Sequence, residues 1–317
     1  MSSINPHVKC CSYQPALPNF LVGQALADET LGEAGRALLR ARIAADVAVT
    51  PLGLGRSPTY SLVYRHGSQQ GFGRSRALRC AYYVEDGGLC GIWRHRNAVC
   101  ATWFCKHVRG QVAATFWGAM KQLLTVLESD LAQWCLLELG LETSALERLM
   151  VTGLETGALT VADLDGRSDP SSSEAMWGSW GSRREELYVS CAKLVAPLDF
   201  GEALRRCGPE ARVRVRILQD AWRRLSSPEA PARLRPGKLT VVRSGPTTCT
   251  VTTYSHHDPV EVHRALLDTL HHFDGGPTDR AVEAIEREGR MRLSKELVLR
   301  MSDFAVLVAD EGRRVDS

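Results

Sequence analysis

Residues 80–105 read CAYYVEDGGLCGIWRHRNAVCATWFC, and the four cysteines of this stretch are the strongest feature of the sequence. Cys80, Cys90, Cys100 and Cys105 are separated by nine, nine and four residues. Thiolates are soft ligands that suit zinc, copper(I) and iron–sulfur clusters, and four of them complete a closed tetrahedral shell. The segment therefore predicts a metal centre.

Two further thiols, Cys10 and Cys11, lie near the start of the chain. If this segment folds back on the cluster, six thiols can form one four-thiolate centre with two spares, or a multinuclear cluster. Cys135 and His107 are additional candidate ligands. The spacing leaves open a structural zinc site, an iron or iron–sulfur centre with redox or catalytic work, and idle reduced thiols. It identifies no catalytic residue.

The residues around the cysteines fit a metal centre. Basic side chains are expected to offset the negative charge of the thiolates: Arg79, Arg94, Arg96 and Lys106. Large aromatic side chains are expected to keep water away from the site: Trp93, Trp103 and Phe104.

Composition places the chain among ordinary globular proteins. It has 317 residues, of which 24% are charged, and a formal net charge of only +3, so no global charge excess indicates nucleic acid or membrane binding. No stretch of 18 uninterrupted apolar residues predicts a membrane span. The N-terminus lacks the pattern of a secretion signal, which predicts a cytoplasmic protein. Ten cysteines in a reducing compartment indicate metal or redox sites rather than disulfides.

Residues 9–107 resemble the YkgJ family, whose members carry a cysteine-rich head and a zinc- or iron-chelating domain. The family's later Cys…Gly-x-Cys-x-Ile-Tyr…Arg-Pro…Cys…Cys stretch is matched by Cys80, residues 88–93, Arg96-Asn97, Cys100 and Cys105. Trp93 and Asn97 replace the family's Tyr and Pro, and only Cys10-Cys11 remains of the longer head motif. The resemblance implies that these cysteines bind iron or zinc.

Apolar periodicity predicts a mainly helical first domain over residues 1–225. One long amphipathic helix is expected over Val112–Leu139, with others over Leu26–Val49 and Arg184–Val195. Residues 1–22 are expected to be irregular because of their prolines, residues 56–79 to form a loop, and residues 165–182 to be a soft region.

A second domain is expected over residues 226–317. Leu239–Arg243 and Thr248–Tyr254 predict a β-hairpin. Three short helices, Val260–Phe273, Thr278–Glu288 and Ser294–Met301, and a strand at 304–308 are expected to follow. The fold class is therefore α+β, mainly helical, with a cysteine-rich metal-binding domain followed by a small winged-helix-like domain.

The order of elements in the second domain, together with Phe273-Asp274-Gly275, is similar to the PqqD-like recognition module. The resemblance implies that residues 226–317 bind a peptide or protein, as an added strand at a sheet edge. Nucleic acid is the less favoured partner, because the arginine-rich stretch from Arg205 to Arg243 precedes the module. Nothing in the sequence indicates an oligomeric state.

The remaining candidates favour structural roles. Cys191, Cys207 and Cys249 are expected to be small buried side chains. The pairs His256-His257 and His271-His272 are expected to be polar or solvated, with Asp258 capping a helix. Residues 163–166 begin like a calcium loop but lack its twelfth-position Glu. Glu128 and Glu138 share one face of the long helix and are expected to be solvated, although they can act as acid or base if they approach the cluster.

Overall fold

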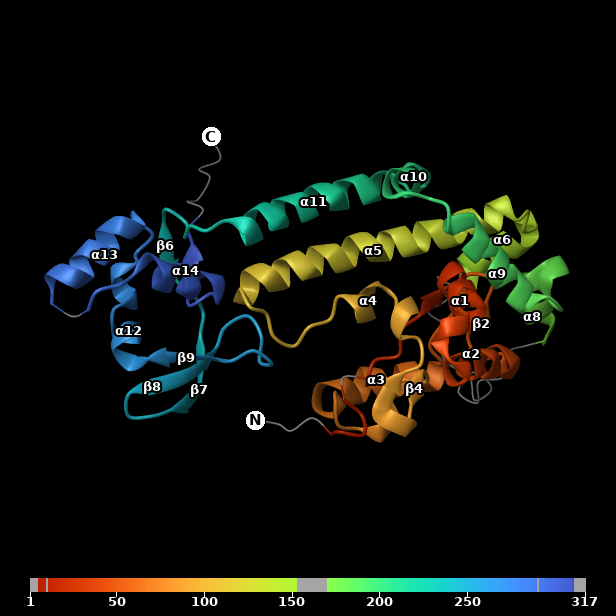
Figure 1. Cartoon of the computed structure of the whole chain (residues 1–317), viewed down its shortest axis with the longest axis horizontal. Coiled ribbons are helices and arrows are strands. Elements are labelled where there is room, and N and C mark those ends of the chain that lie inside the picture. Colours follow the sequence, from red (N-terminus) through yellow and green to blue (C-terminus); the bar gives the residue numbers. More distant parts are fainter. Residues whose placement is uncertain (1–4, 10, 153–169, 290, 311–317) are drawn as a thin grey trace. The chain divides into compact units, whose positions relative to one another are not determined.

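The computed structural model describes residues 5–9, 11–152, 170–289 and 291–310 (Figure 1). It is an α+β protein and mostly helical, which confirms the expected fold class at that level. The described chain divides into two compact units, each built from two segments. Unit 1 comprises Met1–Ala101 and Leu123–Arg212, and unit 2 comprises Thr102–Gln122 and Val213–Ser317. The helices α5 and α11 contribute residues to both.

Unit 1 is built mainly from helices, with short strands between them. Its helices are α1 (Asn19–Ala27), α2 (Glu33–Ala45), α3 (Pro58–Gly71), α4 (Ala98–Ala101), most of α5 (Gly110–Glu138), α6 (Thr143–Thr152), α8 (Pro170–Trp177), α9 (Arg184–Val195), α10 (Phe200–Arg206) and the start of α11 (Pro209–Ser226). Its strands are β1 (Leu17–Pro18), β2 (Val49–Thr50), β3 (Gly53–Leu54), β4 (Tyr83–Val84) and β5 (Leu89–Cys90). They form an antiparallel β1–β3–β2 sheet and a β4–β5 hairpin.

The packing of α1 on α9 forms the centre of unit 1. Gly23 of α1 lies directly against the main chain of Tyr188 and Val189, and Leu187 and Tyr188 are fully buried. This close approach depends on the missing side chain at Gly23, because a Cβ there would lie 1.8 Å from the carbonyl oxygen of Tyr188.

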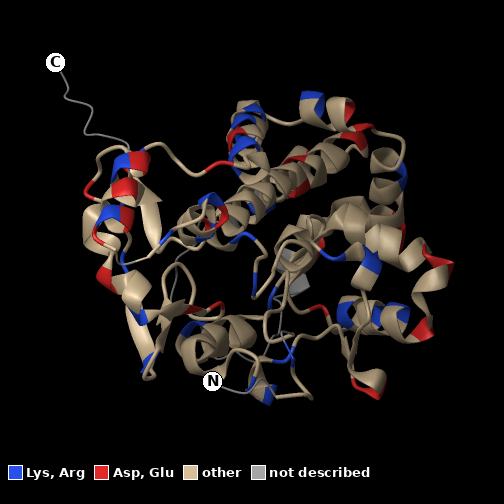
Figure 2. Ribbon diagram, turned by 60° about the vertical axis from the view of Figure 1, so that its left-hand side comes forward, with Lys and Arg blue, Asp and Glu red and all other residues tan. Residues whose placement is uncertain are grey.

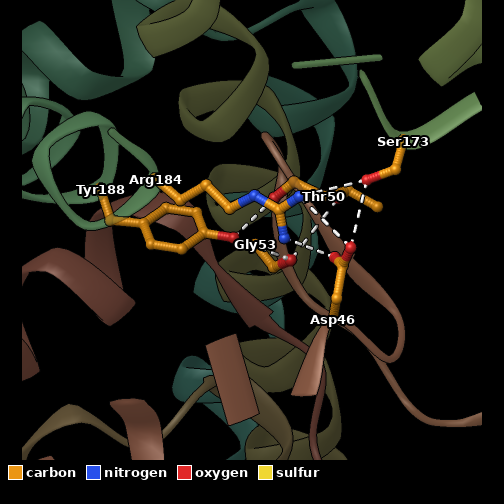
Figure 3. A network of polar contacts seen from close by, with 6 residues as sticks. All are labelled: Asp46, Thr50, Gly53, Ser173, Arg184 and Tyr188. Atoms are coloured by element: carbon orange, nitrogen blue, oxygen red, sulfur yellow. Dashed lines mark hydrogen bonds and ion pairs between the residues drawn. The ribbon is translucent and has the colours of Figure 1, made fainter. Parts of the chain in front are cut away.

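A polar network joins α9 to the first hundred residues (Figure 3). The Arg184 guanidinium donates to both carboxylate oxygens of Asp46, at 2.5 and 3.2 Å, and to Ser173 Oγ at 3.2 Å. The Tyr188 hydroxyl donates to the carbonyl oxygen of Thr50 at 2.8 Å. Asp46 has a φ of 52°, in the left-handed region that few non-glycine residues adopt and that Asp adopts more readily than most. The network therefore fixes the turn between α2 and β2.

Unit 2 combines two small antiparallel sheets with short helices. Its strands are β6 (Leu234–Pro236), β7 (Thr240–Ser244), β8 (Thr248–Thr252), β9 (Val260–His263) and β10 (Leu307–Ala309), and its short helices are α12 (Arg264–Asp268), α13 (Thr278–Arg287) and α14 (Lys295–Asp303). The sheets have the orders β7–β8–β9 and β10–β6. Their shared core is apolar and includes Val251, Phe273 and Ile285.

Several sequence predictions are confirmed. Helix α5 covers the expected Val112–Leu139 to within two residues, and α9 coincides with the expected helix. Strands β7 and β8 form the expected hairpin, while α13 and α14 match the last two expected helices.

Other predictions are wrong in part. The expected loop at 56–79 contains α3, because Ser57 accepts a hydrogen bond from Tyr60 N–H and Pro58 occupies the first helical position. The expected helix over Leu26–Val49 is interrupted, since Gly32 has a φ of 77°. The soft region at 165–182 contains α8, although residues 165–169 lie outside the described part of the chain.

Differences also occur at the head and in unit 2. The irregular head expected over residues 1–22 ends before α1, which begins at Asn19. Pro18 precedes the helix and therefore does not interrupt it. Residues 260–263 form β9 rather than the start of a helix, since they pair with β8. Within the described residues, no helix combines the length and apolar character needed to cross a membrane.

Candidate metal centre

The N-terminal segment lies directly against the cysteine-rich segment. The N–H of Cys80 donates to the carbonyl oxygen of Cys11 at 2.7 Å. The residues that follow Cys11 are held by Tyr60. The Tyr60 hydroxyl lies 3.1 Å from the carbonyl oxygen of Ser12 and accepts from Gln14 N–H at 2.8 Å. These bonds hold the backbone around Cys11 in place from α3, which the sequence did not predict as a helix.

The β4–β5 hairpin brings Cys90 close to Cys80. Tyr83 of β4 lies opposite Cys90 of β5. At the start of this hairpin, the N–H of Tyr82 donates to Cys80 Sγ at 3.5 Å. Hydrogen bonds from main-chain N–H groups to cysteine sulfur are among the features that tune thiolate metal centres.

Cys100 is positioned by the start of the short helix α4. The Asn97 side chain is buried, and its Oδ1 accepts from Cys100 N–H at 3.1 Å. Glu128 of α5 accepts from Ala98 N–H at 2.6 Å. Both contacts satisfy N–H groups at the N-terminus of α4, so Cys100 lies on a backbone that is held from two directions.

Burial and neighbouring thiols shift two pKa values in this part of unit 1. Burial raises the pKa of the Cys80 thiol to about 12, and the neighbouring Cys90 adds to this effect. Burial, followed by the thiols of Cys80 and Cys100, raises the pKa of the Tyr82 phenol well above its usual range, although the Arg42 guanidinium opposes the shift. The thiols of Cys80 and Cys100 therefore act on the Tyr82 phenol, and the Cys90 thiol acts on that of Cys80.

The other predicted ligands fall elsewhere. Cys10 lies outside the described residues, and Cys105 belongs to unit 2 and is half-buried. Cys135 is fully buried on α5, where its thiol lies 3.7 Å from the carbonyl oxygen of Cys191. His107 is in unit 2, and its Nδ1 lies 3.5 Å from the Tyr254 hydroxyl.

The donor set has the right chemistry for a soft metal. Thiolates favour zinc, copper(I) and iron–sulfur clusters, and unit 1 contains Cys11, Cys80, Cys90 and Cys100. Within the part of the chain that the structure describes, no three His, Cys, Asp or Glu side chains already form a group that could hold a metal ion. The cysteines are therefore of the type that a thiolate centre uses, but the described side chains do not form a set of metal ligands.

Two expectations about the surroundings are wrong. Trp93 is 62% exposed and stacks with Arg96, whose guanidinium carbon lies 3.6 Å from its ring centroid, so it does not shield the thiols from water. Phe104 is 45% exposed and packs on Trp117 in unit 2.

The secondary candidates behave mostly as structural residues. Cys191, Cys207 and Cys249 are buried, as predicted. Asp258 does not cap a helix, because β9 follows it; its carboxylate accepts from the His107 N–H and the Tyr254 hydroxyl instead. The calcium-like residues 163–166 lie outside the described residues.

The sequence analysis missed a histidine–carboxylate pair that joins the cysteine-rich segment to Asp28, the residue after α1. His95 Nε2 lies 2.8 Å from Asp28 Oδ2, and both side chains are mostly buried. Asp28 also accepts from the N–H of Thr30. Neither residue stands out in sequence, because 67 positions separate them and no spacing motif links them.

Comparison of the chain with protein-family models, with curated proteins and with solved structures found no match. The residues themselves therefore provide the grounds for a functional assignment.

Glu128 leads to a prediction about pH. Burial raises its pKa to about 7, despite the opposing hydrogen bond from Ala98 N–H. Because this lies above the ordinary value of 4.5, the folded protein holds a proton that the unfolded chain releases, so the free energy of unfolding falls as pH rises from 4.5 to 7. Glu128→Gln keeps an acceptor for Ala98. We expect it to be about 2 kcal/mol more stable than the unchanged protein at pH 8 and equal to it below pH 4.5.

The measurement is urea unfolding of both proteins at several pH values. Glu138→Gln is the matched control, because Glu138 lies on the same helix and accepts from Trp134 Nε1 at an exposed position. A difference between Glu128→Gln and the unchanged protein that does not vary with pH would contradict the prediction.

Proposed function

We propose that this chain is a cytoplasmic metalloprotein whose cysteine cluster binds iron, as an iron–sulfur or multinuclear iron centre, or zinc. The proposed ligands that unit 1 provides are Cys80, Cys90 and Cys100, together with Cys11. The observation that carries the proposal is the local grouping of Cys11, Cys80 and Cys90: the Cys80 N–H donates to the carbonyl oxygen of Cys11, and Cys90 lies opposite Tyr83 in the β4–β5 hairpin. The soft thiol chemistry of these cysteines supports the same choice of metals.

In this proposal the fold positions the cysteine backbones before the metal binds. Asn97 and Glu128 hold the backbone at Cys100, while the β4–β5 hairpin holds Cys90 beside Cys80. Iron bound there would supply redox chemistry, whereas zinc would close the fold as a structural ion.

The first experiment is metal analysis of protein purified without oxygen, together with its visible absorption spectrum. Iron with labile sulfide in a brown sample would support a redox centre. About one zinc per chain in a colourless sample would support a closed structural site. A protein that stays metal-free, and takes up neither metal on anaerobic reconstitution, would overturn the proposal.

A second function, binding of a peptide or protein by a winged-helix-like domain over residues 226–317, is favoured by strand β7. All five residues of β7 are exposed, including Val241 and Val242, and β7 is an edge strand of its sheet. An exposed apolar edge can accept an extended peptide as an additional strand. If zinc serves only to stabilise the first domain, the protein is a non-enzymatic adaptor or regulator that acts through this second domain.

DNA is a less suitable partner for this domain. Helices α13 and α14 carry acidic residues beside their basic ones, and Figure 2 shows both signs mixed on the helices of unit 2. A helix that enters the major groove needs a predominantly basic surface to contact phosphates.

Deletion of residues 227–317 tests the separation of the two functions. We expect the truncated protein to bind the same amount of metal per chain as the full-length protein, because Cys11, Cys80, Cys90 and Cys100 all belong to unit 1. Metal content and far-ultraviolet circular dichroism are measured together. A truncated protein that retains its helicity but no metal would show that the deleted residues are needed for binding.

A further inference from the structure

The loop that precedes α5 exposes large apolar side chains to solvent. It comprises residues 102–109, all of which belong to unit 2 (Figure 1). Val108 is 96% exposed, and Trp103 and Phe104 are each nearly half exposed. A single exposed apolar side chain is ordinary, but a group of them in one short loop indicates a surface that binds a partner.

Exposed rings continue from this loop across α5 to α11. The centroid of the Phe104 ring lies 4.7 Å from that of Trp117 on α5. The Trp117 ring lies 5.2 Å from Phe116, which lies 5.6 Å from Trp222 on α11. Phe116 is buried, whereas Trp222 is 55% exposed. These four residues form one aromatic face of unit 2, and Phe104 joins that face to the exposed loop.

Both segments that supply the aromatic face are basic. Residues 102–122 contain three lysines or arginines and no acidic residue. Residues 213–226 contain four arginines and one acidic residue, Asp220, which pairs with Arg223. The surroundings of the rings are therefore complementary to an anionic surface.

The two buried carboxylates that contact the loop are already engaged. Asp303 accepts two hydrogen bonds from the Arg109 guanidinium, and Asp258 accepts from the His107 N–H. Lys106, in contrast, is exposed and forms no ion pair within the described part of the chain. The loop therefore presents a positive charge beside its apolar side chains.

An anionic bilayer fits these features better than a nucleic acid does. Bases stack on free ring faces, whereas each ring of the aromatic face is already packed against another ring. Val108 has no ring on which a base could stack, but its transfer from water to an apolar environment is favourable. Aromatic and aliphatic side chains beside basic ones are typical of segments that lie in the membrane interface, where the rings reach the headgroup level.

We propose that unit 2 binds the surface of an anionic membrane, with Trp103, Phe104 and Val108 inserted into the interface and Lys106 in contact with lipid phosphates. This contact requires no membrane-spanning helix, because only the side chains of one loop enter the interface. The inference goes beyond the proposed metal centre, since the inserted residues belong to unit 2.

The first test is cosedimentation of the full-length protein with phosphatidylcholine vesicles that contain about one third phosphatidylglycerol, or none. We expect strong binding only to the anionic vesicles. Val108→Asp is expected to weaken this binding about tenfold, because it removes an apolar side chain from the interface and adds a negative charge. Val242→Asp is the matched control, because Val242 is an exposed valine of the same unit that lies on β7. Both positions are exposed, so both variants are expected to fold, which circular dichroism checks.

The second test distinguishes insertion from adsorption by charge alone. Vesicles of the same anionic composition with brominated acyl chains quench the fluorescence of a tryptophan ring that reaches the chains. We expect them to quench the unchanged protein, and to quench Trp103→Phe less, although this variant still binds. Trp93→Phe removes an exposed tryptophan of unit 1, so the quenched component should remain.

Three results would overturn the proposal. The unchanged protein could fail to bind anionic vesicles, Val108→Asp could bind them as tightly as Val242→Asp does, or binding could occur without quenching. A protein that ignores the vesicles but binds a single-stranded oligonucleotide, and loses that binding on Trp222→Ala, would assign the aromatic face to nucleic acid instead.

Discussion

Replacing Cys100 with serine is expected to release most of the metal from the protein, and Cys90→Ser is expected to do the same. A serine hydroxyl is a far weaker ligand for zinc or iron than a thiolate, and a four-ligand shell that loses one sulfur binds its metal much less tightly. Cys90 lies on β5, and Cys100 is held by the Asn97 side chain at the start of α4. The readout is metal per chain, measured after anaerobic purification.

Cys249→Ser is the matched control for these variants. Cys249 is buried in the core of unit 2, and its sulfur lies 3.6 Å from Ser244 Oγ. Its replacement tests the general effect of inserting a hydroxyl in place of a buried thiol, and metal content should not change. Full metal content in both Cys90→Ser and Cys100→Ser would remove these two cysteines from the ligand set.

Sequence spacing identifies the cysteines as a group, but the residues that surround them in space cannot be read from it. Arg42 of α2 donates to the Tyr82 hydroxyl, and Tyr60 of α3 donates to the carbonyl oxygen of Ser12, from positions that no motif connects to Cys80. Proximity in sequence to a cysteine also fails to predict what the nearby arginines contact. Arg79 and Arg94 lie within a few positions of a cysteine, yet their side chains bind Glu85 and Thr30.

The secondary structure, like the surroundings of the cysteines, is only partly predictable from the sequence. Helix α5 was predictable because its apolar residues recur over many turns, and the β7–β8 hairpin because two β-rich runs flank a Gly-Pro turn. Helix α3 was not, since its composition is polar and glycine-containing, and only Ser57 and Pro58 mark its start. Residues 260–263 form a strand because they pair with β8. This pairing is a tertiary interaction, which local propensity cannot predict.

The largest effect on stability is expected from Gly23→Ala. In an isolated helix this change would stabilise by about 1 kcal/mol, because alanine is the better helix former. Here the new Cβ would lie 1.8 Å from the carbonyl oxygen of Tyr188, and 2.4 Å from its carbonyl carbon. Both atoms belong to the main chain of α9, so no side chain can rotate away and the two helices must separate.

We therefore expect Gly23→Ala to lower the free energy of unfolding by about 3 kcal/mol, at the upper end of the usual cost of overpacking. Urea unfolding followed by circular dichroism measures this loss. Gly118→Ala is the control, because Gly118 also lies within a helix, α5, and a Cβ there meets no atom within 4 Å. That variant should be unchanged or slightly more stable. Equal stability of the two variants would mean that α1 and α9 do not meet at Gly23, and the contact at the centre of unit 1 would have to be abandoned.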